Sequence, residues 1–399
     1  MHTDPLTPKP PAPRSRLGTA LRFVILLGVV SLLSDATYEG ARSITGPFLA
    51  ALGATGTVVG VVAGFGELVG YGLRLISGVI SDRTGRYWAI TLIGYAINLL
   101  VVPLLALAGR WEVAAALMIS ERVGKAIRTP ARDAMLSHAT AEVGRGWGFG
   151  LHEAMDQLGA VAGPLIVVAV LHARGNYRTA FVVLLAPALL ALSMLIVARY
   201  LYPRPRDLEA PPRRLQAAGF PRVFWLYLAA VALVAAGYVD FPLIAYHFQK
   251  RAVVPETWIP LSYAVAMGVD ALAALVFGRL YDRIGIPTLA IVGLISAWFA
   301  PLTFLGGFWL ALAGMALWGV GMGAQESIMR AAIAGMVSPE RRGSAYGLFN
   351  AGYGLTWFMG SALMGTLYDL SLPALIAFSV ATQLAAVPLF LLVKKRASD

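Results

Sequence analysis

The sequence predicts an all-α membrane protein in which twelve spanning helices form two six-helix halves. Hydrophobic residues make up 58% of the 399 residues and charged residues only 13%, which is far from the composition of soluble proteins. Several stretches without Asp, Glu, Lys or Arg reach the length of about 20 residues that a spanning helix needs. These stretches are 88–108, 179–198, 345–368 and 370–393. Strands of a membrane β-barrel would instead be about 10 residues long and alternate in polarity.

The remaining spans are interrupted by charges or joined by short turns. Residues 286–325 are uncharged and long enough for two spans, with a turn at Gly306 and Gly307. We therefore expect spans at 20–42, 57–80, 87–107, 113–135, 147–171, 179–200, 222–245, 258–278, 287–305, 308–330, 345–368 and 371–393.

Loop charges predict how the chain lies in the membrane. Most of the 32 Lys and Arg residues fall in the loops of one side, together with both chain ends, and basic loops stay in the cytoplasm. We expect a multi-pass protein of the cytoplasmic (inner) membrane with both termini cytoplasmic. The predicted parts are a disordered tail at 1–19, an N-terminal bundle at 20–200, a linker at 201–221, a C-terminal bundle at 222–393 and a tail at 394–399.

Composition also excludes several functions. The net charge of +11 lies in short loops rather than on one soluble face, which does not favour nucleic-acid binding. The chain has no Cys, so disulfides and thiolate metal sites are excluded. Residues 1–19 are rich in Pro and lack the short apolar core and cleavage site of a signal peptide.

One charged turn occurs twice, at equivalent points of the two halves. The stretch 78–87 reads GVISDRTGRY and the stretch 278–287 reads GRLYDRIGIP, each between the second and third span of its half. A second echo, RGWGFGL at 145–151 and RGSAYGL at 342–348, follows between the fourth and fifth spans. Two halves that repeat in the same orientation are typical of transporters whose substrate site lies between them.

With these repeats, the chain resembles the major facilitator superfamily over essentially its whole length. The resemblance implies that the repeated turn acts as a latch between two conformations. The residues concerned are Gly78, Asp82, Arg83, Gly85 and Arg86 in the first copy and Asp282 and Arg283 in the second, which ends in Ile286 instead of Arg.

A second motif lies in the fifth predicted span. Gly159, Gly163 and Pro164 form a Gly-x-x-x-Gly-Pro element that is similar to the one characteristic of the superfamily's antiporters, most of which are exporters. Val167 and Val168 stand where the family pattern usually has a final Gly pair, so the match is partial. Small residues four apart also let any two membrane helices approach closely, which is the alternative reading.

Ionisable residues gather in particular spans. The third span of each triplet carries none well inside the membrane, whereas the first and second spans carry nearly all of them. In the resembled family the third helices face lipid and the first ones line the central cavity. Because charges in lipid are costly, this distribution predicts a polar pathway inside the bundle.

The N-terminal half holds the candidates for proton coupling. Asp35 and Glu39 are four residues apart and share a helix face, so repulsion and burial favour a proton on one of them. An Arg at the position of Arg122 often assists proton coupling in the resembled family. The full candidate set is Asp35, Glu39, Arg122, His152, Glu153 and Asp156.

Other charged residues in these spans are expected to form ion pairs or to lie toward the membrane surfaces. Glu67 and Arg74 share a face and are expected to form an ion pair. Arg128 and Arg132 lie nearer the cytoplasm and are expected to extend toward it. Asp240 is expected close to the outer surface.

Polar and aromatic residues of both halves are candidates for a substrate cavity at mid-membrane. They are Lys125, Gln157, Trp318, Gln325, Asn350 and Tyr353. His152 and the nearby carboxylates are also ligands that a divalent cation accepts, which leaves a metal substrate open.

The sequence favours a proton-coupled antiporter that exports a small organic molecule by alternating access. The alternatives are a proton-coupled uptake symporter and a divalent metal-ion exporter. An enzyme is not expected, because the chain has no nucleotide-binding loop and no compact nucleophile motif. We expect no cofactor, and the expected partners are the substrate, protons and the lipid bilayer, with the monomer as the functional unit.

Overall fold

The computed structural model describes residues 13–143, 145–174, 176–203, 220–337 and 342–398. The N half contains α1 (Pro13–Ala51), α2 (Gly56–Thr84), α3 (Tyr87–Leu104), the short η1 (Leu105–Leu107), α4 (Trp111–Val143), α5 (Arg145–Arg174), α6 (Tyr177–Val183) and α7 (Leu185–Leu201). The C half contains α8 (Arg222–Gly237), α9 (Phe241–Arg251), α10 (Trp258–Ile284), α11 (Pro287–Ser296), α12 (Phe299–Leu305), α13 (Phe308–Met336), α14 (Arg342–Leu370) and α15 (Leu372–Ser398). The all-α prediction is therefore confirmed, with no strand in the described ranges.

Three predicted spans are each split into two helices by a proline. These breaks separate α6 from α7, α8 from α9 and α11 from α12. Pro187, Pro242 and Pro301 each follow a break by a few residues. Proline lacks an N–H and clashes with the carbonyl four residues before it, so it interrupts the helix at that point. Counting each split pair once, the described helices correspond to the twelve predicted spans.

Ten of these spans are long and apolar enough to cross a membrane by composition alone, within the described residues. The two others are α4 and α14. Helix α4 carries Glu121, Arg122, Lys125 and Arg128, which the fold places inside the bundle rather than against lipid.

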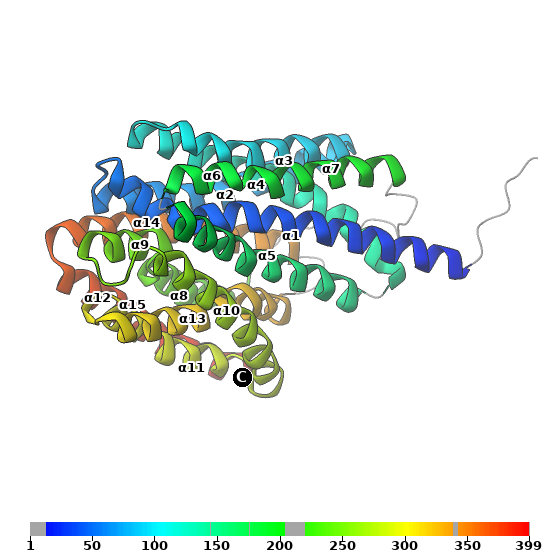
Figure 1. Ribbon diagram of the computed structural model, residues 1–399. Coiled ribbons are helices and arrows are strands. Elements are labelled where there is room, and N and C mark those ends of the chain that lie inside the picture. The colour runs from blue at the N-terminus through cyan, green and yellow to red at the C-terminus, as the bar shows by residue number, and fades with distance from the viewer. Residues whose placement is uncertain (1–12, 144, 175, 204–219, 338–341, 399) are drawn as a thin grey trace, which may run out of the picture.

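The peripheral helices are those predicted to carry no charge. Figure 1 shows α3, α6 and α7 along one side of the molecule and α11, α12 and α15 along the opposite side. The helices α1, α2, α5, α10 and α14 lie between these two layers and form the contact between the halves. This arrangement places the charged spans in the interior, as predicted.

The two halves meet most closely at the end of the bundle that holds the α1–α2 turn. Gly46 of α1 packs against the backbone of Pro242 at the start of α9, and Gly60 of α2 packs against Gly365 of α14. Asp369 accepts hydrogen bonds from the backbone N–H groups of Gly56 and Thr57, at 2.9 and 2.7 Å. We call this the far end of the bundle, since α1 begins and α15 ends at the other end.

Candidate functional site

The two acids of α1 lie on one buried face, as predicted. Asp35 is 6% exposed and Glu39 is 8% exposed. Each meets a cation of α4: Arg128 Nη2 lies 4.0 Å from Asp35 Oδ1, and Lys125 Nζ lies 3.9 Å from Glu39 Oε1. Glu39 Oε2 also accepts a hydrogen bond of 2.6 Å from Tyr263, which belongs to α10 in the other half.

Arg128 is fully enclosed, contrary to the expectation that it extends toward the cytoplasm. Only 1% of it is exposed. Its guanidinium lies 4.2 Å from the centre of the Tyr95 ring and 5.7 Å from that of Tyr38. A cation between aromatic faces is stabilised electrostatically and loses less on leaving water. Tyr38 of α1 and Tyr95 of α3 thus stabilise the buried guanidinium of Arg128. The spacing of residues along α4 could not reveal this, because the two rings come from other helices.

The structure brings together two of the predicted proton-coupling residues, His152 and Asp156, with Ser31 of α1 and Arg132 of α4. His152 Nε2 lies 3.1 Å from the hydroxyl of Ser31, and His152 Nδ1 lies 3.5 Å from Asp156 Oδ1. Arg132 donates a hydrogen bond of 2.9 Å to Ser31 and lies 3.9 Å from Asp156. Arg132 therefore also points into the bundle rather than toward the cytoplasm. Glu153 is exposed and lies outside this cluster.

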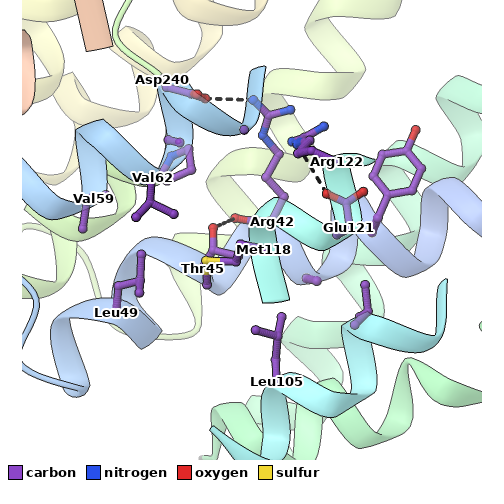
Figure 2. Close-up of a pocket in the computed structure, with 16 residues that line it drawn as sticks. Arg42, Thr45, Leu49, Val59, Val62, Leu105, Met118, Glu121, Arg122 and Asp240 are labelled. Atoms are coloured by element: carbon purple, nitrogen blue, oxygen red, sulfur yellow. Dashed lines mark hydrogen bonds and ion pairs between the residues drawn. The ribbon is translucent and has the colours of Figure 1, made fainter. Parts of the chain in front are cut away.

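Arg122 pairs with two acids of the N half. Its guanidinium lies 3.4 Å from Glu67. It also lies 3.3 Å from Glu121, a contact that Figure 2 shows. Glu121 also accepts a hydrogen bond of 2.5 Å from Asn98 of α3. Glu67 was expected to pair with Arg74, but its ion-pair partners are Arg122 and Arg42.

Sequence reasoning missed Arg42, which connects the two halves. Its Nη2 lies 3.3 Å from Glu67 and 2.8 Å from Asp240, which stands at the break between α8 and α9. Asp240 is only 2% exposed, because it is enclosed between the two halves. It also accepts a hydrogen bond of 3.4 Å from the Trp357 indole. The signal was available in part, since Arg42 follows Glu39 at i+3 on the same helix face.

This ionic group borders a cavity of about 60 Å³. Figure 2 shows Arg42, Glu121, Arg122 and Asp240 on one side and apolar residues from α1, α2, α3 and α4 on the other. The apolar residues include Leu49, Val59, Val62, Leu105 and Met118. A volume of this size holds a few water molecules, whereas sites for drug-sized ligands measure about 300–1,000 Å³. In this conformation the cavity therefore suits water and protons.

The predicted substrate-cavity residues are distributed over both halves. Lys125 Nζ lies 4.0 Å from the centre of the Tyr38 ring. Tyr353 donates a hydrogen bond of 2.9 Å to Gln325, and the two residues are buried together. Trp318 is 1% exposed and donates a hydrogen bond of 2.9 Å to the carbonyl of Val239 at the helix break. Its role in the structure is thus to satisfy that carbonyl.

Two further predicted cavity residues, Gln157 and Asn350, are half-buried on α5 and α14. Gln157 lies on the side of α5 that approaches Asp270 of α10. Together with Lys125 they leave part of their surface accessible, whereas Trp318, Gln325 and Tyr353 are buried.

The residues of the predicted latch lie at the end of the bundle away from the α1–α2 turn. Asp82, Arg83, Arg86, Asp282 and Arg283 are all exposed. The hydroxyl of Tyr87 donates a hydrogen bond of 3.4 Å to Asp82. Within the described ranges, none of the five charged latch residues forms an ion pair.

Both latch copies keep a glycine where the backbone requires one. Gly85 ends α2 with φ 63°, and Gly285 ends α10 with φ 69°. Only glycine adopts such left-handed conformations without steric cost, so the repeated Gly sets the turn itself. Gly78 is a looser contact, because a side chain there would meet Pro130 at an ordinary 3.6 Å.

The Gly-x-x-x-Gly-Pro element joins α5 to α1. A Cβ at Gly159 would collide with the carbonyl of Leu32, and one at Gly163 would collide with that of Ala36. The two helices are thus in backbone contact just where α1 carries Asp35 and Glu39. Pro164 lies inside the continuous helix α5.

The fold and its buried ion pairs together indicate the class of protein. Two bundles of membrane-spanning helices enclose buried ion pairs, and one ionic group crosses from one bundle to the other. This arrangement is that of a polytopic transporter. A family model described as Major Facilitator Superfamily matches residues 27–323 and, in an overlapping second match, 241–399. The chain belongs to the major facilitator superfamily and is a multi-pass membrane transporter, not an enzyme.

Relatives and solved structures agree with this assignment. A protein of Mycobacterium tuberculosis described as uncharacterized is 46% identical over 376 residues, which cover 92% of each chain. An uncharacterized MFS-type transporter of Methanocaldococcus jannaschii is 26% identical and covers 87% of this chain and 89% of its own.

Among solved structures, the fold is similar to that of the nucleoside transporter NupG, in a mutant form, with a TM-score of 0.73, 13% identity and coverage of 93% of this chain and 99% of the other. It is equally similar to a mutant of the peptide transporter POT, with a TM-score of 0.73, 14% identity and coverage of 98% and 99%. At these identities the likeness shows the fold alone.

Proposed function

We propose that the protein is a proton-coupled antiporter that exports a small organic molecule across the cytoplasmic membrane. Both termini are placed in the cytoplasm, as the basic loops favour. The observation that carries the proposal is the position of Glu39. This one carboxylate approaches Lys125 in its own half and accepts a hydrogen bond from Tyr263 in the other half.

A proton on Glu39 would change the contact between the halves. Protonation removes the attraction to Lys125 and turns one carboxylate oxygen from an acceptor into a donor. The hydrogen bond from Tyr263 then competes with other arrangements, and the balance between two conformations shifts. A ligand or proton can drive alternating access only through such a difference between states.

The α5 cluster offers a second place for the proton to act. His152 of α5 contacts Ser31 of α1 and Asp156 of α5. Arg132 of α4 contacts the same two residues. His152 is buried beside Arg132, so within this cluster the carboxylate of Asp156 is the candidate for carrying the proton. Ser31, Asp35 and Glu39 follow one another at intervals of four residues, so these polar groups share one face of α1.

Export rather than import is supported by the partial antiporter-like element at Gly159, Gly163 and Pro164. Uptake driven by the same proton site remains the competing direction. A divalent metal substrate receives no support from the geometry: within the described residues no three His, Asp or Glu side chains come together to hold a metal ion.

The function is tested in two steps. A deletion strain and its complemented partner are first challenged with a panel of toxic organic compounds and divalent metal salts. The compound whose tolerance depends on the protein is then measured, in radiolabelled form, for uptake into inverted membrane vesicles under an imposed pH gradient. We expect uptake that a protonophore abolishes and that Glu39→Gln and Asp156→Asn lose.

The matched control is Glu112→Gln, which removes an exposed acid at the start of α4 whose partner is the exposed Arg110. It should retain uptake. Uptake that ignores the pH gradient, or that survives both Glu39→Gln and Asp156→Asn, would contradict the proposal.

A further inference from the structure

One buried carboxylate lies outside the network of charge pairs. Asp270 of α10 is 2% exposed, and its Oδ1 has no hydrogen-bond partner. Each buried acid of the α1–α4 region has an Arg or Lys within 4.0 Å, as Asp35 and Glu67 illustrate. Asp270, by contrast, forms no ion pair with any residue that the structure describes.

Among the described residues, the charged side chains that act most strongly on Asp270 are all acids. The α13 neighbour is Glu326 and the α5 neighbours are Glu153 and Gln157. Glu39 of α1 is the next acid, and Tyr238 at the α8–α9 break faces the same carboxylate. An ionised carboxylate without a cation is unfavourable in such a place, because burial removes its hydration and a hydrogen bond from Gln157 offsets only part of the loss.

The space around Asp270 suits a proton better than a metal ion. Gly323 of α13 packs directly on this residue, since a Cβ at Gly323 would lie 2.7 Å from Oδ1. Among the described residues, no group of three acids or histidines gathers at Asp270 to hold a divalent metal ion. A proton needs one lone pair and no added volume.

We propose that Asp270 is a proton-binding site of the C half whose protonation controls the contact between α5 and α10. This site rests on the proposed proton-coupled function and adds a second proton site to it, in the other half. The step is a simple proton transfer: a proton from water adds to Oδ1 in one conformation and returns to water in the other.

The position of Asp270 gives this proton a mechanical consequence. Asp270 and Tyr263 are seven residues apart on α10, which is two helical turns, so both face the N half. Tyr263 binds Glu39 and Asp270 approaches Gln157. The neutral acid stabilises this dry contact, whereas the ionised acid requires water and therefore favours a conformation in which α5 and α10 separate.

The proposal is tested first by infrared difference spectroscopy on the purified full-length protein between low and high pH. We expect a carbonyl band of a protonated carboxylic acid that disappears at high pH, that is absent in Asp270→Asn and that persists in Asp240→Asn. Asp240 is the matched control because it is equally buried but paired with Arg42. Asp270→Glu, which keeps the carboxyl group, should show a shifted band and reports that the loss in Asp270→Asn is not caused by misfolding.

Two results would overturn the proposal. One is a band that persists unchanged in Asp270→Asn. The other is a band that sodium, compared with choline at the same pH and ionic strength, removes, because sodium would then be the occupant.

The failure of this site and of the proposed function can be told apart. Gradient-driven uptake that is lost in Glu39→Gln but unchanged in Asp270→Asn overturns the Asp270 site and leaves the function standing. A titrating Asp270 band in a protein whose uptake ignores the pH gradient supports the site and contradicts the proposed function.

Discussion

At the scale of single residues, α1 and α4 face each other as a series of opposite charges. Asp35 pairs with Arg128, and Glu39 pairs with Lys125. The two acids are one helical turn apart on α1, and the two cations are about one turn apart on α4. Each pair compensates the desolvation of its members, but neither distance is short. When one member of such a pair gains a proton, the charge of its partner is left buried and uncompensated, which favours a rearrangement.

The Arg128 site predicts a clear effect on stability. Arg128→Met should lower the free energy of unfolding by about 3–5 kcal/mol, because Asp35 is left buried without its cation. Unfolding in mixed detergent micelles measures this change. The double variant with Asp35→Asn should recover part of the loss, and Arg83→Ala, which removes an exposed Arg, is the control. A double variant no more stable than Arg128→Met would contradict this reading.

The sequence could predict acids on one face but not their partners in space. The i, i+4 spacing of Asp35 and Glu39 is a property of one helix, and the structure confirms it. Arg42 and Asp240 are 198 residues apart, so no local pattern links them. Arg128 was misread for the same reason, because its aromatic neighbours come from other helices.

At the scale of elements, glycines decide which helices touch. Along α5, the glycines that face α1 are in contact with its backbone, while Gly150 near the start of the same helix has nothing within 4 Å of its missing side chain. Close backbone approach increases the packing of two membrane helices where no hydrophobic force drives them together. The close backbone contact between α1 and α5 therefore fixes the position of the part of α1 that carries Asp35 and Glu39.

Two alanine variants separate packing from helix propensity. Gly163→Ala should destabilise the protein by about 1–3 kcal/mol, because the added methyl group meets the Ala36 carbonyl and lies 2.7 Å from the Gly40 nitrogen. Gly150→Ala adds the same group in open space and should be neutral or slightly stabilising. Thermal unfolding monitored by tryptophan fluorescence measures both. Equal effects of the two variants would show that backbone contact is not the cause.

The number and kind of helices followed from the sequence, but several of their limits did not. Helix α1 runs from Pro13 to Ala51, beyond the predicted 20–42, and α15 continues to Ser398. The length of an apolar run reflects the thickness of the hydrocarbon core of the membrane. The helix itself can continue beyond that run into polar residues at both ends. The breaks before Pro187, Pro242 and Pro301 were missed because a proline in an apolar run shows only that a kink is possible.

At the scale of the whole molecule, the far end is where the two halves are joined. The buried Arg42–Asp240 pair joins α1 to the start of α9. Asp369 of α14 accepts a hydrogen bond from the backbone N–H of Gly56 at the start of α2. The latch residues at the other end form no ion pairs within the described ranges. These contacts close the far end in this conformation, and we propose that this end opens in turn during alternating access.

The Arg42–Asp240 pair predicts how firmly the far end is closed. We expect Asp240→Ala to increase the population in which the halves separate at the far end, because Arg42 then loses its partner in the C half. Spin labels on Leu107→Cys and Trp309→Cys, both strongly exposed near this end, report the separation as a distance distribution. The absence of native Cys makes this labelling specific.

The control for this prediction is Arg110→Ala, which removes an exposed ion pair with Glu112 on the same side of the molecule. It should leave the distances unchanged, since exposed pairs contribute little. Identical distance distributions in Asp240→Ala and in the parent would mean that the pair does not hold the halves together.

The central claim is that protons on buried carboxylates shift the balance between two arrangements of the halves. The most direct measurement is the distance between the same two labels across a range of pH, in lipid nanodiscs and without substrate. Two distances should be present, and their ratio should change with pH in the parent and lose most of that change in Glu39→Gln. A single distance, or a ratio that is the same at every pH, would contradict the account.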